Sequence, residues 1–108
     1  MLADALREAA AAGVRVVAIE LGRWQGRPLL AEFDPAAKII GIDRKVVERL
    51  RAAGDGEFAN RFVAFAIWHE LYHVRYSTRD ERAAHEYASA RTGVAAALFE
   101  NVVREFQR

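Results

Sequence analysis

The longest helical periodicity in the chain runs from Glu57 to about Tyr76, a stretch without glycine or proline. Its apolar and imidazole side chains recur at steps of three and four residues, which is the spacing of one face of an α-helix. The residues on this face are Phe62, Phe65, Ala66, His69 and His73. The pattern therefore predicts one long amphipathic helix that carries two histidines on the same side as its aromatic residues.

Shorter patterns flank this helix. Three runs rich in apolar and β-branched residues favour strands, at 14–21, 28–33 and 38–42. Turn-forming residues at 22–26 follow the first strand, and the segment at 34–37 reads DPAA, which favours a hairpin connection. Four further segments favour helices, at 2–12, 44–52, 81–91 and 94–106. Asp43 is a candidate N-cap, while Gly13 and Gly93 are candidate helix stops.

The order of these elements predicts an α+β fold, in which a small three-stranded sheet packs against helices. A chain of 108 residues is long enough for one domain with one modest hydrophobic core. The sequence contains no internal repeat and no low-complexity linker. We therefore expect residues 1–108 to form a single domain, with any functional site on the surface of that core.

Composition excludes several classes of function. Sixteen Lys and Arg against fifteen Asp and Glu give a net charge of +1, so nothing in the composition favours binding to nucleic acid. The absence of cysteine excludes disulfides, thiolate metal sites and cysteine nucleophiles. Asp4 and Glu8 lie where a signal peptide would need an apolar core, and the longest uncharged runs are too short to span a bilayer. The expectation is a cytoplasmic protein without a membrane partner.

The strongest chemical signal is the HELYH motif at 69–73, an HExxH within the longest predicted helix. Two histidines four residues apart lie about one helical turn apart on the same face, so both imidazoles can reach one metal ion. Glu70 lies beside them and could contact a metal-bound water without binding the metal itself. Zinc lowers the pKa of such a water, and a glutamate can take its proton during attack on a carbonyl.

A catalytic zinc site also needs a third protein ligand, and the candidates follow on the next predicted helix. The metzincin pattern would require glycine at position 76 and histidine at position 79, where this chain has Tyr76 and Arg79. That class is therefore excluded. Glu81 and His85 lie one turn apart on one helix face, and either residue could be the third ligand.

The two motifs together resemble the gluzincins, in which the third zinc ligand is a glutamate on a second helix. The segment ERAAHEYA at 81–88 is similar to the ExxA(D/N)xFA pattern of ImmA/IrrE-type and related peptidases. Chain length, a short strand layer and a brief link between the helices look most like the minigluzincins, which are single-domain zinc metallopeptidases. The resemblance implies that His69 and His73 bind Zn2+, that Glu81 is the third ligand and that Glu70 is the general base. His85 stands where the pattern usually has Asp or Asn.

The fold that the resemblance implies is a minimal zincin, with the three-stranded sheet packed on the HExxH helix and on a glutamate helix. The implied function is zinc-dependent hydrolysis of peptide bonds in a peptide or protein substrate. The alternative is a zincin-fold regulatory or binding module with little or no proteolytic activity. In zincins the substrate adds itself to an edge strand. We expect this edge to be the strand at 38–42, with the strand at 28–33 as the alternative.

Three further groups of residues are secondary candidates. Tyr72, Tyr76 and Tyr87 could donate to a developing oxyanion or could simply pack, and Arg75 and Arg79 could bind a substrate carboxylate or face solvent. Minigluzincins are latent forms blocked by their own C-terminal segment. The resemblance therefore suggests that Glu100, Glu105 or the terminal carboxylate blocks the site. The alternative for this segment is an amphipathic terminal helix that covers the core.

Overall fold

The computed structural model describes residues 1–20, 30–54, 56–77 and 79–106, and these form an α+β fold with a small three-stranded sheet and five helices. The turn expected at 22–26 and the terminal carboxylate lie outside the described residues. In chain order the elements are α1 (Leu2–Ala11), β1 (Arg15–Ile19), β2 (Ala31–Asp34), β3 (Ile39–Asp43), α2 (Arg44–Ala53), α3 (Gly56–Tyr76), α4 (Glu81–Thr92) and α5 (Ala96–Phe106). Their order and type confirm the predictions from the sequence pattern.

The sheet is mixed, with the strand order β1-β3-β2. β3 pairs in parallel with β1 and antiparallel with β2, so β3 is the central strand and β2 is an edge. The expectation that 38–42 would be the exposed edge is therefore wrong. The physical reason is burial, because Ile40, Gly41, Ile42 and Asp43 are all buried whereas burial alternates along β2. Nearly continuous burial is typical of a strand paired on both sides.

Local hydrogen bonds explain where the elements begin and end. Asp34 Oδ1 accepts hydrogen bonds from the backbone N–H groups of Ala36 and Ala37, which shapes the hairpin connection between β2 and β3. Asp43 caps α2 by accepting from the backbone N–H groups of Lys45 and Val46. The first pair of bonds lies at the end of β2, which forms one wall of the site described below.

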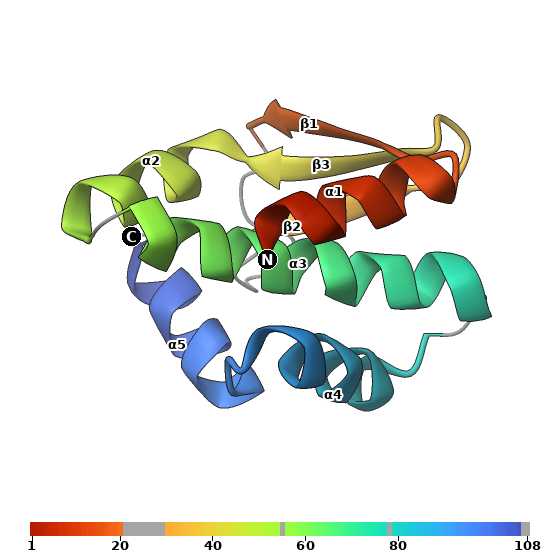
Figure 1. Cartoon of the computed structure of the whole chain (residues 1–108). Coiled ribbons are helices and arrows are strands. Elements are labelled where there is room, and N and C mark those ends of the chain that lie inside the picture. The colour runs from red at the N-terminus through yellow and green to blue at the C-terminus, as the bar shows by residue number, and fades with distance from the viewer. Residues whose placement is uncertain (21–29, 55, 78, 107–108) are drawn as a thin grey trace.

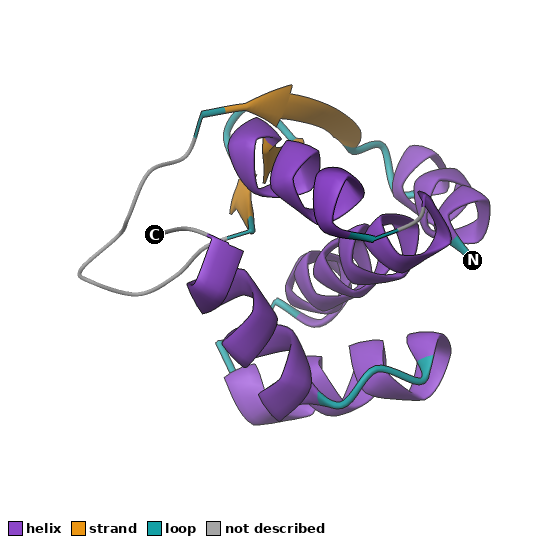
Figure 2. Cartoon of the chain, turned by 90° about the vertical axis from the view of Figure 1, so that its left-hand side faces the viewer, coloured by secondary structure: helices purple, strands orange, loops and turns teal. Residues whose placement is uncertain are grey.

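Helix α3 is the centre of the molecule. Figure 1 shows it running between the layer formed by the sheet with α1 and the layer formed by α4 and α5. Figure 2 shows the same arrangement from the side. The helix is 21 residues long and has nine buried residues, which are Ala59, Phe62, Val63, Ala64, Phe65, Ala66, Ile67, Trp68 and Leu71. Its middle is therefore covered from several sides, as expected of a helix at the centre of a core.

Helices α4 and α5 form the other layer. Asp80 caps α4, its side chain accepting from the backbone N–H of Ala83, and α4 ends at Gly93, whose φ of 73° is a left-handed conformation that favours glycine. Helix α5 packs through Phe99, which stacks on Phe65 with a centroid distance of 4.3 Å, and through Val103, which is fully buried. The C-terminal segment is thus an amphipathic helix that covers the core.

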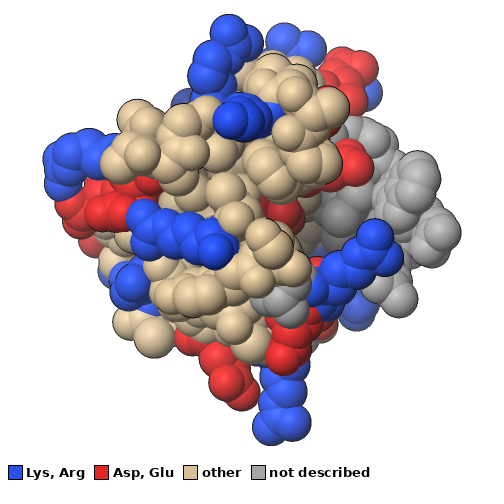
Figure 3. All heavy atoms as spheres, turned by 90° about the vertical axis from the view of Figure 1, so that its right-hand side faces the viewer, with Lys and Arg blue, Asp and Glu red and all other residues tan. Residues whose placement is uncertain are grey.

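Among the residues that the structure describes, no helix combines the length and the apolarity needed to cross a bilayer. Figure 3 views the molecule from the side on which α3 ends, and there acidic and basic side chains are interspersed among uncharged ones. Among the described residues on this face, no broad surface of one sign is visible.

Candidate metal centre

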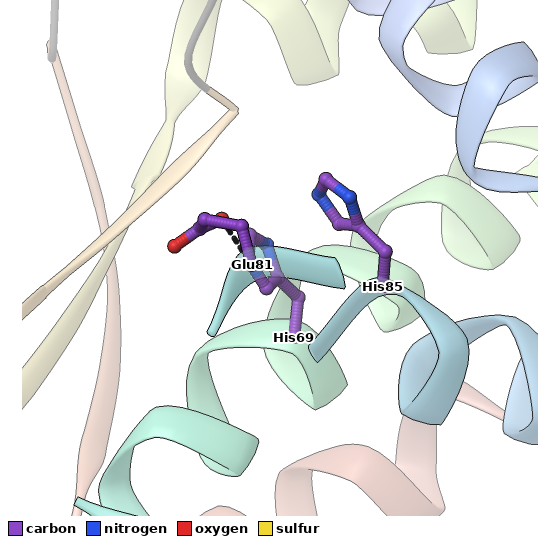
Figure 4. A group of neighbouring side chains, drawn as sticks. All are labelled: His69, Glu81 and His85. Carbon is purple, nitrogen blue, oxygen red and sulfur yellow. Dashed lines mark hydrogen bonds and ion pairs between the residues drawn. The ribbon is translucent and has the colours of Figure 1, made fainter. Parts of the chain in front are cut away.

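Two elements bring the central residues of the site together. His69 and His73 lie one turn apart on α3, and each has a side chain that is 15% exposed. Glu81 is the first residue of α4, where the short connection after α3 returns the chain to the same side of the helix. Glu81 Oε2 lies 2.9 Å from His69 Nε2, and Glu81 Oε1 lies 2.9 Å from His73 Nε2. Figure 4 shows the side chains of His69 and Glu81 meeting between the two helices.

The spacing of these donor atoms suits a small cation. The two histidine Nε2 atoms are 3.2 Å apart, so the three side chains place their donor atoms 2.9 to 3.2 Å from one another. Tetrahedral zinc has bonds of about 2.0–2.1 Å, so two of its ligand atoms are separated by about 3.3 Å. The donor atoms of His69, His73 and Glu81 are therefore within a few tenths of an ångström of that arrangement.

His85, one turn after Glu81 on α4, lies beside this group. Its donor atom and those of His69 and Glu81 all lie within 4.8 Å of one another, so these three residues could also hold a metal ion. The ring centroids of His69 and His85 are 4.6 Å apart. His73 Nε2 lies 2.9 Å from Glu81 Oε1, which is well within this limit of 4.8 Å. We therefore favour the set His69, His73 and Glu81 over the set that contains His85. Both candidates for the third ligand, Glu81 and His85, are nevertheless at the site.

Glu70 and His69 have strongly altered acid–base properties. The side chain of Glu70 is only 13% exposed, and its burial, reinforced by the negative charges of Glu81 and Glu32, raises its pKa from 4.5 to about 8. Burial lowers the pKa of His69 from 6.5 to about 4, against the raising effect of Glu81. At neutral pH the metal-free protein therefore has a neutral His69, which is the form that binds metals, next to a protonated Glu70. Their contact, 3.9 Å between His69 Nδ1 and Glu70 Oε1, is not an ion pair in that state.

These residues line a cavity of about 550 Å³. One wall is the stretch Leu30–Phe33, which includes most of the edge strand β2, and the opposite wall is α5. The remaining lining residues are Ala66, His69, Glu70, His73, Glu81, His85, Phe99, Glu100 and Arg104. Of the alternative edge at 28–33, the part from residue 31 onward belongs to β2, which is an edge strand of the described sheet. A cleft between an edge strand and a set of metal-ligating side chains can hold an extended chain next to a cation.

The tyrosines considered as oxyanion donors lie elsewhere. Tyr72 packs against Tyr76 and Tyr87, with ring centroids 4.7 and 5.4 Å away, and none of the three is among the residues that line the cavity. Arg75 donates to the Tyr87 hydroxyl and to the carboxylate of Glu8 on α1, which ties α3 to two neighbouring helices. The packing interpretation therefore describes these side chains better than the catalytic one.

Sequence reasoning missed two charged residues of the cavity. Glu32 lies on β2 close enough to raise the pKa of Glu70. Its position between the apolar residues Ala31 and Phe33 was the only feature of the sequence that could have pointed to it. Arg104 follows Glu100 by four residues on α5, so both side chains lie on one face of that helix and both line the cavity. A guanidinium at this position suits a carboxylate group, which is the role that the sequence suggested for Arg75 or Arg79.

Comparisons of the chain with protein-family models, with curated proteins and with solved structures found no match. The functional interpretation of the site therefore rests on the chemistry of its own residues.

Proposed function

We propose that the protein is a zinc-dependent peptidase of the minimal zincin type, with the gluzincin ligand set His69, His73 and Glu81. The observation that carries this proposal is the convergence of three donor groups, 2.9 to 3.2 Å apart, next to the buried carboxyl group of Glu70. A site used only to hold structural zinc has no need of such a group, whereas hydrolysis requires a proton acceptor at this place.

Each residue has a distinct role in this proposal. A zinc ion would supply a Lewis acid that lowers the pKa of a water toward about 7 and polarises the scissile carbonyl. Glu70 takes the proton from the attacking water and delivers it to the leaving amine. Its burial suits this exchange, because a carboxyl group with a raised pKa holds a proton at neutral pH and gives up that proton when a positive charge is nearby.

The edge strand β2 supplies the substrate position. Within the described sheet β2 pairs with β3, and Leu30–Phe33 line the cavity. An extended peptide can add to such an edge through main-chain hydrogen bonds, which places its carbonyl groups along the cleft with little dependence on side chains. The expected substrate is therefore a peptide or an unfolded segment of a protein.

Helix α5 has a place in the same proposal. Latency through the C-terminal segment would require a carboxylate of that segment to approach the three ligands. Phe99 and Val103 instead hold α5 in the core, and Glu100 lies 3.7 Å from His85 Nδ1. We therefore assign α5 the role of a fixed wall of the cleft. If the C-terminal segment instead blocked the metal site, its removal would increase peptidase activity.

The test compares two substitutions on the same helix. Glu70→Gln removes the proton acceptor but none of the three ligands, whereas Glu57→Gln changes an exposed carboxylate at the other end of α3. We expect about one zinc per chain in both variants and in the native protein, measured by elemental analysis. Cleavage of a mixed peptide library should be lost in Glu70→Gln alone.

A folded, zinc-loaded native protein that cleaves no peptide would contradict the proposal and favour the regulatory or binding module. A protein that binds no zinc would contradict both the enzyme and its metal centre.

A further inference from the structure

The His85 side chain lies between the proposed metal ligands and a carboxylate of α5. One of its ring nitrogens lies within 4.8 Å of the donor atoms of His69 and Glu81. His85 Nδ1 lies 3.7 Å from Oε1 of Glu100, which belongs to α5. Its ring is 21% exposed and lies against Phe65, with the centroids 6.1 Å apart. Figure 4 shows the ring on α4, beside Glu81 and His69.

The contact with Glu100 determines which nitrogen is available. A carboxylate can only accept a hydrogen bond, so it favours the tautomer of His85 that carries its proton on Nδ1. The distance of 3.7 Å is slightly too long for a hydrogen bond, and a small rotation of the exposed Glu100 side chain would close it. Nε2 then has a free lone pair. Ligand histidines in metal sites have this arrangement, with a carboxylate at the other nitrogen that fixes the tautomer and raises the basicity of the ring.

We infer that His85 is a fourth protein ligand of the metal centre through Nε2, and that Glu100 holds it in place from α5. The inference rests on the proposed zinc site. Four protein ligands make a closed site, whereas a catalytic zinc with three protein ligands keeps a position for water. His85 therefore occupies that position in the resting protein, and a substrate carbonyl or a water molecule has to displace it before hydrolysis. Helix α5 remains a fixed wall of the cleft and acts on the site only through Glu100, which orients the imidazole of His85.

The residue pattern supports this assignment over a role in packing. Glu81 and His85 lie one turn apart on α4, just as His69 and His73 do on α3, so each helix offers two donors on the face that lines the cavity. If this position served only for packing, a phenylalanine would fill the space beside Phe65 equally well. A packing role would give no reason for the carboxylate of Glu100 next to Nδ1 of His85.

The experiment counts the imidazole ligands of bound zinc in the full chain by X-ray absorption spectroscopy. The variant His85→Phe keeps an aromatic ring against Phe65 but has no lone pair. Glu100→Gln removes the charge of the partner, and Glu105→Gln is the matched control, because Glu105 is an exposed carboxylate on α5 that does not line the cavity. Zinc affinity is measured in parallel by competition with a chelator.

We expect three imidazoles per zinc in the native protein and in Glu105→Gln, and two in His85→Phe. The zinc dissociation constant should rise at least tenfold in His85→Phe and by 10- to 100-fold in Glu100→Gln. At saturating zinc, His85→Phe should turn over peptide faster than the native protein because no side chain competes for the open position. Two imidazoles in the native protein, or an unchanged dissociation constant in His85→Phe, would overturn the inference.

Failure of this inference differs from failure of the proposed function. If His85 instead assists the reaction by contacting the substrate, the native protein would show two imidazoles and His85→Phe would lose turnover without losing zinc. That result rejects the fourth ligand and keeps the peptidase. If every variant binds zinc as expected and none cleaves peptides, the fourth ligand stands and the peptidase is rejected.

Discussion

The substitution Glu70→Gln should protect the metal-free protein from a loss of stability at alkaline pH, because the variant has no buried carboxyl group that ionises there. The pKa of Glu70 is about 8 in the folded protein and 4.5 in its ordinary environment. The folded state therefore binds this proton more tightly than the unfolded state. Its contribution to stability is fully present below pH 4.5 and is lost as the pH rises toward 8. Each pKa unit corresponds to about 1.4 kcal/mol, so the total loss is about 5 kcal/mol.

The informative window lies above pH 6.5. His69, whose pKa is lowered to about 4, acts in the opposite sense, because its contribution is lost as the pH falls below 6.5. Between pH 6.5 and 9 the Glu70 contribution should still change by about 2 kcal/mol. For a domain of this size, 2 kcal/mol corresponds to a fall in Tm of about 10 °C.

The assay is thermal unfolding, followed by circular dichroism in the presence of a chelator, at several pH values from 6.5 to 9. We expect the native protein and the control Glu57→Gln to lose about 10 °C over this range. Glu70→Gln should lose much less, because its amide does not ionise. If the native Tm is constant over the range, or if Glu70→Gln falls in parallel with it, burial of an ionisable Glu70 is the wrong explanation.

The other predictions concern the proposed metal ligands and the core. His73→Ala and Glu81→Ala should each weaken zinc binding by more than tenfold in a chelator competition, and native affinity in either variant would remove that residue from the ligand set. Phe65→Ala should lower the free energy of unfolding by about 3–5 kcal/mol in urea titrations, because its side chain is fully buried against α5; a change below 1 kcal/mol would contradict that packing. Truncation after Leu98 should destabilise the protein by about 3–6 kcal/mol through the loss of two buried side chains. A truncated chain of native stability with increased peptidase activity would favour a C-terminal segment that blocks the metal site.

Local patterns predicted the elements of the site well because its chemistry is local in sequence. The step of four residues from His69 to His73 requires only a helix, and α3 provides it. The return of Glu81 to the same place requires a short connection and a helix start, and in the structure Asp80 caps that start. The residues that close the cavity come from β2 and α5, and no local pattern specifies how distant elements pack against the α3–α4 pair.

The choice of edge strand shows the same limit from another direction. Strand 39–43 reads IIGID, and strand 31–34 reads AEFD. The alternation of the second is the pattern of a strand with one solvated face, and the nearly unbroken apolar run of the first is the pattern of a buried central strand. The sequence therefore contained the signal for the correct order. The pairing partner of β3 was not readable, because β1 is distant in sequence and joins β3 in parallel.

The short separation in sequence of the proposed zinc ligands has a consequence for how the molecule holds together. His69 and Glu81 are 12 positions apart, so a cation bound between them would join the last turns of α3 to the start of α4 across a very short loop. Closing so short a loop carries a small entropic penalty, and the helical hairpin can therefore capture the ion without help from the sheet. Loss of the ion should therefore loosen the junction between α3 and α4, while the buried side chains of α4 and α5 keep both helices on the core. Amide hydrogen exchange should accordingly be faster in the apoprotein than in the zinc-loaded protein in the first turn of α4, and little changed in the middle of α3 and in α5.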